Sequence, residues 1–145
     1  MSLTRANTEF MIVASNGPLL TAAGMAVTVV GSNASLNAPI GHAIRQLGHT
    51  VASAVLVTDA DVAGVTDAET DEFLGLAELY TLEAILGNLD DVDITVGPRT
   101  EKLNQLAKQV ESKIERLLKA LAKTYGYGLS VPTAGYIQKN IAEHD

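Results

Sequence analysis

The sequence predicts a mainly α-helical protein: a small bundle of helices over residues 37–47, 66–87 and 98–125, with extended or short-strand arms at both termini. Three observations lead to this fold class. Apolar residues recur at steps of three and four over 98–125, a helix-start signal lies at 66–69, and a glycine follows each helix. A length of 145 residues suits one domain. We expect an N-terminal arm (1–35), a helical core (36–125) and a C-terminal tail (126–145).

The N-terminal arm is expected to hold only short elements. Thr4 or Asn7 can cap a short helix that the sequence Asn16-Gly17-Pro18 stops, and residues 19–23 can add one or two turns before Gly24 ends them. No formal charge occurs over 10–44, which raises the question of a signal peptide or membrane helix. Since a glutamate precedes the apolar run and polar residues interrupt it, we expect a soluble protein, with a signal peptide as the alternative.

Residues 37–47 form the first predicted core helix. Asn37 stands just before Ala38-Pro39, as an N-cap followed by a first-turn proline, and Gly48 ends the helix. The β-branched run at 26–30 and the Val-rich run at 50–58 flank this helix and are predicted to be strands or extended segments.

Residues 66–87 form the second predicted core helix. Thr66-Asp67-Ala68-Glu69 is a capping box, and acids crowd the first turn, where the helix dipole favours them. Apolar residues cover most of the circumference of this helix as far as Gly87, so we expect packing on more than one side and burial against another subunit. Residues 90–97 are predicted to be a linker with a short extended part.

Residues 98–125 form the longest helix, which Gly126 ends. Its apolar stripe follows the helical period rather than a strict heptad, which favours a straight amphipathic helix. The stripe comprises Leu103, Leu106, Val110, Ile114, Leu117 and Leu121.

Charge is distributed unevenly along the chain, whose net charge is −7. Residues 59–93 hold acids and no Lys or Arg, for a segment charge of −11, whereas 99–123 has a net charge of +4. A net acidic chain is unsuited to coating DNA. The two segments can be ordinary solvated helix faces, or they can attract each other within one chain or across a subunit boundary.

No pattern of catalytic, cofactor-binding or metal-ligating residues emerges. The chain has no cysteine, no phosphate-binding glycine loop and no paired histidines at helical metal spacing. We therefore predict that the protein is not an enzyme and binds neither a cofactor nor a metal. We interpret Asn33-Ala34-Ser35 as a chance match to the glycosylation pattern. The residues considered and set aside for metal binding are His42, His49, His144, Asp59, Asp61, Asp90, Asp91 and Asp93.

Two linked stretches resemble a known family: LAELYTLEAILGNL over 76–89 and VDITVGPRTEKL over 92–103, which leads into the long helix. Together with NAPIGHAIRQLG over 37–48, they are similar to the head–tail connector (adaptor or head-completion) proteins of long-tailed bacteriophages. The resemblance covers residues 35–125 and rests on the arrangement of the helices and the general residue pattern along them.

This resemblance implies a structural virion protein of the phage neck, present in the host cytoplasm during assembly. It implies a homo-oligomeric ring, dodecameric in expectation, that joins the portal to stopper or tail-tube proteins and lets DNA pass without sequence-specific binding. The resemblance implies no catalytic residue. We further expect an acidic channel lining, which would not grip DNA. The alternative is a non-viral helical oligomerisation or adaptor module.

Overall fold

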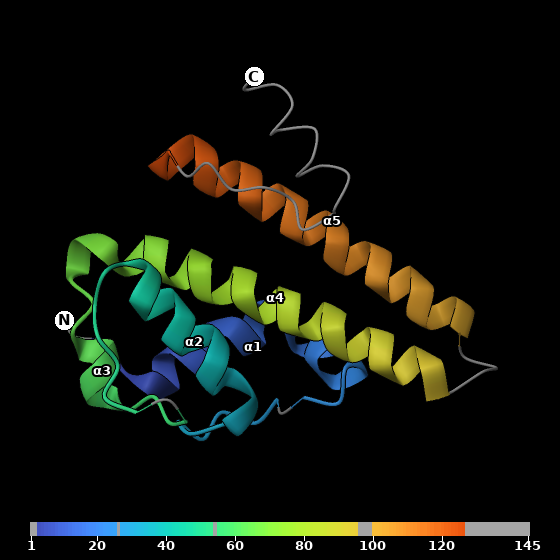
Figure 1. Ribbon diagram of the computed structural model, residues 1–145, viewed down its shortest axis with the longest axis horizontal. Helices are drawn as coiled ribbons and strands as arrows, with labels where there is room; N and C mark the ends of the chain where they lie inside the picture. Colours follow the sequence, from blue (N-terminus) through green and yellow to red (C-terminus); the bar gives the residue numbers. More distant parts are fainter. Residues whose placement is uncertain (1–2, 26, 54, 96–99, 127–145) are drawn as a thin grey trace.

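The computed structural model describes residues 3–25, 27–53, 55–95 and 100–126, with side chains described outside 90–95 and 100–103. The described residues form a mainly helical bundle without a strand (Figure 1), which confirms the predicted fold class. Its elements are α1 (Arg5–Ala22), α2 (Ala34–Gln46), α3 (Asp59–Ala63), the short 3₁₀ helix η1 (Asp67–Glu69), α4 (Thr70–Thr95) and α5 (Thr100–Tyr125).

Helix α4 is the centre of the bundle. It contacts α1, α2 and α5, and α5 lies antiparallel beside it (Figure 1). The apolar sides of α4 are thus covered by three helices of the same chain, which explains their breadth without a second subunit. The buried α4 residues are Phe73, Leu76, Ala77, Leu79, Leu82, Ile85 and Leu89.

The prediction that residues 1–35 are an arm is wrong for α1. This helix packs against α4 and places Ile12, Leu19 and Leu20 in the core. The predicted stop survives as a kink at Asn16, whose φ of −134° and ψ of 20° leave the helical region. Pro18 explains the kink because it lacks an amide hydrogen and its ring collides with the preceding turn.

Helix α2 begins one turn earlier than predicted. Asn33 is its N-cap, and Asn37 lies inside the helix. Local sequence favoured Asn37, but its side chain bonds to residues of α1 and of the loop before α3 instead. Gly48 ends the helix as predicted, with a φ of +88° that suits glycine. The described parts of the runs 26–30 and 50–58 contain no strand.

Helix α4 does not end at Gly87 but continues to Thr95, so the predicted linker at 90–95 is helix. Gly87 lacks the positive φ of a helix-ending glycine, and apolar packing of Ile85 and Leu89 on either side of it favours continuation.

Helix α5 ends at Tyr125, before Gly126, as predicted. Its stripe is confirmed at Val110, Ile114 and Leu121, which are buried; Leu118 joins them, while Leu106 and Leu117 are half-buried. Leu103 and residues 127–145 of the predicted tail lie outside the described side chains and residues.

Candidate functional site

A buried ion pair joins Arg5 and Glu9, one turn apart on α1. Both side chains are fully buried, and Nε of Arg5 donates to Glu9 Oε2 at 2.8 Å. The guanidinium also donates to Asn37 Oδ1 (2.6 Å) and to the carbonyl oxygens of Val57 (3.0 Å) and Asn33 (2.7 Å). Arg5 therefore ties α1 to α2 and to the loop before α3.

The carboxylate of Glu9 holds the loop that joins α1 to α2. It accepts hydrogen bonds from the backbone amides of Val30 (3.3 Å), Gly31 (3.0 Å) and Asn33 (3.0 Å), and from Asn33 Nδ2 (2.6 Å). Charges taken out of water need such partners, since desolvation otherwise exceeds the gain from pairing. The protein itself supplies these partners, and the network thereby fixes the loops at 30–33 and 57.

Sequence reasoning did not find this network. A signal was present, because Arg5 and Glu9 are the only formal charges before Arg45 and stand at i,i+4 spacing on a predicted helix. Their burial depends on tertiary partners at 30–33, 37 and 57, which the sequence around Arg5 and Glu9 does not predict.

The fixed loops carry an exposed aliphatic surface, which we call the valine patch: Val27, Val29, Val30, Val55 and Leu56. Val55 is 79% exposed and Val30 is 60% exposed. The network brings the two loops together: Arg5 binds the carbonyl of Val57 while its partner Glu9 binds the amide of Val30. Both loops run along the edge of the bundle remote from α5 (Figure 1).

The histidines occupy structural positions in the described residues. His42 of α2 stacks on Tyr80 of α4, with ring centroids 4.0 Å apart and planes 8° apart. Nε2 of His49 lies 2.8 Å from Glu69 Oε1. Neither contact activates a nucleophile. His144 lies outside the described residues.

The capping box at Thr66 is confirmed and extended by His49. Glu69 Oε1 also accepts from the Thr66 amide at 3.1 Å and from the Thr66 hydroxyl at 2.9 Å. The hydrogen bond from His49, followed by those from Thr66, lowers the pKa of Glu69 to about 2. These contacts join the start of α4 to the end of α2.

The acidic pairs considered for metal binding are engaged otherwise or lie outside the described side chains. Asp59 accepts from the Arg5 amide at 2.8 Å, and Asp61 closes a capping box with Thr58 at the start of α3. Asp90, Asp91 and Asp93 belong to α4, with side chains outside the description. Within the described residues, no group of three His or acidic residues is placed to hold a metal ion.

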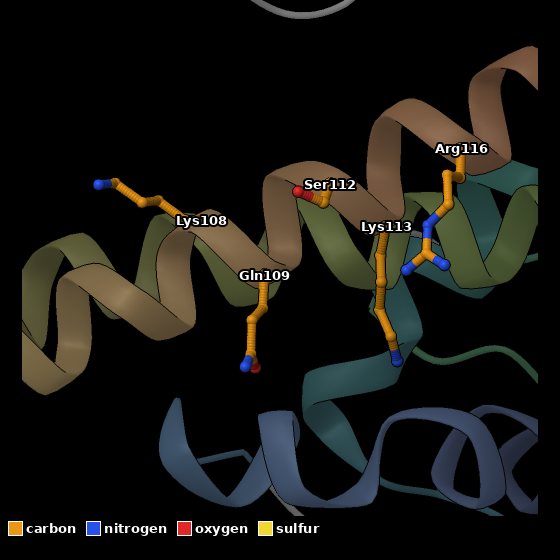
Figure 2. Close-up of a pocket in the computed structure, with 5 residues that line it drawn as sticks. All are labelled: Lys108, Gln109, Ser112, Lys113 and Arg116. Carbon is orange, nitrogen blue, oxygen red and sulfur yellow. The ribbon is translucent and has the colours of Figure 1, made fainter.

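Helix α5 presents a basic surface beside α1. Figure 2 shows Gln109, Lys113 and Arg116 pointing toward α1, while Lys108 points away from it. Together with Ser112, these residues line a shallow hollow of ≈ 430 Å³. Lys113 Nζ donates to the carbonyl of Ser15 (3.2 Å) and to Asn16 Oδ1 (3.0 Å), which anchors α5 at the kink of α1.

No protein-family model, curated protein or solved structure matches the chain. Among the helices of the described residues, none is both long enough and apolar enough to span a bilayer. The molecule is therefore characterised by its fold and by two surfaces, the valine patch and the basic surface of α5.

Proposed function

We propose that this protein is a structural assembly subunit, and specifically a ring-forming component of a phage neck that joins the portal to the tail and lets DNA pass. The observation that supports this function best is the valine patch. Several exposed aliphatic side chains on two neighbouring loops of a folded protein are typical of a protein–protein contact, because water disfavours their exposure and a partner removes that cost.

The construction of the patch favours an interface over incidental exposure. Its two loops are held by a buried ion pair whose desolvation is costly. Asn37 Nδ2 donates to the carbonyl of Val55 at 2.8 Å, and Asn33 Nδ2 donates to the carbonyl of Thr28 at 2.6 Å. A surface fixed before binding loses less conformational entropy when a partner arrives.

The phage assignment rests on the resemblance of residues 35–125. The same resemblance is the source of the proposed partners (the portal and the stopper or tail-tube proteins), the dodecameric copy number, the acidic channel lining and the virion location. A non-viral oligomerisation or adaptor module would use the same patch. The two alternatives differ in the particle formed, since a neck component needs a closed ring with an opening wide enough for duplex DNA.

Light scattering and electron microscopy of the purified chain test the proposal. We expect a closed ring with a central opening for the wild type, and its loss in Val55→Asp, which places a charge in the patch at a side chain that contributes little to the fold. Asn104→Asp adds the same charge to an exposed position on α5 and should assemble normally. A closed dimer, a chain that is monomeric at every concentration, or a ring that Val55→Asp leaves intact contradicts the proposal.

A further inference from the structure

We propose that the C-terminal segment 136–145 of this chain folds back along α5 and occupies a groove between α1, α4 and α5. The segment lies outside the described residues, and its sequence matches the length and the charge of the described groove. This docking site is distinct from the valine patch and independent of the proposed ring.

Three adjoining hollows form the groove, because each shares lining residues with the next. Glu78 of α4 lines the first and the second hollow, and Lys113 and Arg116 of α5 line the second and the third. The first hollow also has residues of α1 in its lining. The apolar lining of the groove comprises Met11, Ile12, Leu74, Leu117 and Ala120.

Charge changes sign along the groove. Its first hollow is lined by the acids Asp71 and Glu78, and its third is lined by the bases Lys108, Lys113 and Arg116. In the middle hollow, Glu78 lies with Lys113 and Arg116. A peptide that fills the groove is therefore favoured when it carries a base toward the first hollow and acids toward the third.

The two ends of the groove lie at different levels of α5. An atom added at Gly75, in the first hollow, would lie 3.1 Å from Leu121, so the acidic end of the groove is level with Leu121. Gln109, in the third hollow, precedes Leu121 by twelve residues, which is about 18 Å at the rise of an α-helix. Because α5 ends at Tyr125, a chain that folds back beyond it meets the acidic end first.

The segment 136–145, YIQKNIAEHD, carries its charges in the required order, with Lys139 ahead of Glu143 and Asp145. In an extended conformation, alternate residues from Ile137 onward share one face. From Ile137 to Glu143 this face spans about 20 Å at 3.3 Å per residue, which matches the separation of the two ends of the groove. The shared face comprises Ile137, Lys139, Ile141, Glu143 and Asp145.

This segment fits the groove better than a nucleic acid does. Asp71 and Glu78 would repel phosphates at one end of the groove, whereas Lys139 is attracted there. Gly128, Pro132 and Gly135 are turn-forming residues between α5 and the segment, which suits a reversal of the chain. The covalent link also keeps the segment at a high effective concentration near the groove.

Cross-linking tests the proposal, since the chain has no cysteine and introduced cysteines form the only disulfides. One variant carries Ala142→Cys with Gln109→Cys, at a residue that points toward α1 (Figure 2). The matched control carries Ala142→Cys with Glu111→Cys, about 200° around α5 from residue 109. With oxidised glutathione as the oxidant, we expect the disulfide within one chain to form about tenfold faster in the first variant. Non-reducing electrophoresis measures both rates.

The charges of the groove should control this rate. Arg116→Glu should slow the cross-link between positions 109 and 142 by about fivefold, the size of an exposed charge interaction. Addition of Glu143→Lys to that variant should restore the rate. Lys119→Glu makes the same change of charge at an exposed residue that pairs with Glu115, and it should leave the rate unchanged.

Three results would overturn the proposal. Equal rates at positions 109 and 111 would show that the segment has no preference for the groove. Equal effects of Arg116→Glu and Lys119→Glu would show that the charges of the groove do not hold it. Disulfides that form only between two chains would place the segment in the groove of a neighbour. Ring formation does not enter these measurements, so the proposed function can fail while this inference holds.

Discussion

At the scale of single residues, the ion pair of Arg5 and Glu9 is the most sensitive point of the fold. Glu9→Gln would leave the guanidinium buried without its counter-charge and weaken the bonds to the loop at 30–33. Removing one partner of a buried pair costs about 3–5 kcal/mol. We expect a loss of this size in the free energy of unfolding measured with urea.

A matched control distinguishes burial from simple pairing. Glu115→Gln breaks the exposed pair with Lys119, where we expect a loss of less than about 1 kcal/mol because water screens the charges. Equal losses for Glu9→Gln and Glu115→Gln would show that the network around Arg5 contributes no more than a surface pair.

The carboxylate of Glu69 should make stability depend on pH in the acid range. The hydrogen bond from His49 lowers its pKa from 4.5 to about 2 in the folded chain. A carboxyl whose folded pKa is depressed contributes stability that is complete above the unfolded pKa and is lost as pH falls through the folded pKa. The advantage of wild type over Glu69→Gln should therefore be full above pH 4.5 and vanish toward pH 2.

Urea unfolding of both chains across this range provides the measurement, with Asp71→Asn as a variant of a neighbouring exposed acid. A difference between wild type and Glu69→Gln that stays constant from neutral pH to pH 2 would contradict the assigned contacts of Glu69.

At the scale of helices, α4 contains a glycine, Gly87, that neither the backbone conformation nor the packing requires. Gly87 has an ordinary helical backbone, and a methyl group added there would meet no atom within 4 Å. Gly87→Ala should raise the free energy of unfolding by about 0.4–1 kcal/mol, because alanine has less freedom in the unfolded chain. Thermal unfolding followed by circular dichroism measures this gain.

Gly24 supplies the opposite case. Its φ of +75° ends α1, with the Met25 amide bonded to the carbonyl of Leu20 at 2.8 Å. Gly24→Ala should destabilise the chain by about 1–2 kcal/mol, since an L-residue is strained in the left-handed region. Stabilisation by both substitutions would show that the two glycines do not differ as described.

The helices show which features a sequence can predict. The caps at Gly24 and Gly48 and the capping box at Thr66 follow from neighbouring residues alone and were predicted. Asn16-Gly17-Pro18 was predicted to end the first helix, but it only kinks α1, which continues to Ala22. The prediction that the helix ends at Gly87 is wrong. A helix-ending glycine adopts a left-handed backbone, which Gly87 does not, and apolar packing on both sides of Gly87 favours continuation of α4.

The candidate surfaces were less predictable because they depend on tertiary contacts. Asn37 was predicted to be the N-cap of α2, but Asn33 holds that position, and Arg5 binds the side chain of Asn37 inside the helix. The β-branched run at 26–30 has the composition of a strand, yet its loop is fixed by Glu9 rather than by a neighbouring strand. The uneven distribution of charge along the chain was visible in the sequence, but the contacts of Lys113 with Ser15 and Asn16 depend on how α1 packs beside α5.

At the scale of the whole molecule, the proposed function makes the valine patch a contact between chains that are already folded. A contact made only by folded chains stabilises them by mass action, so the apparent melting temperature should rise with protein concentration. Val55→Asp should show no such rise while melting near the dilute wild type, because its side chain is exposed. Differential scanning calorimetry over a wide range of concentrations measures both chains. A wild-type melting temperature that is independent of concentration, or an equal rise in Val55→Asp, would show that the patch does not join folded chains.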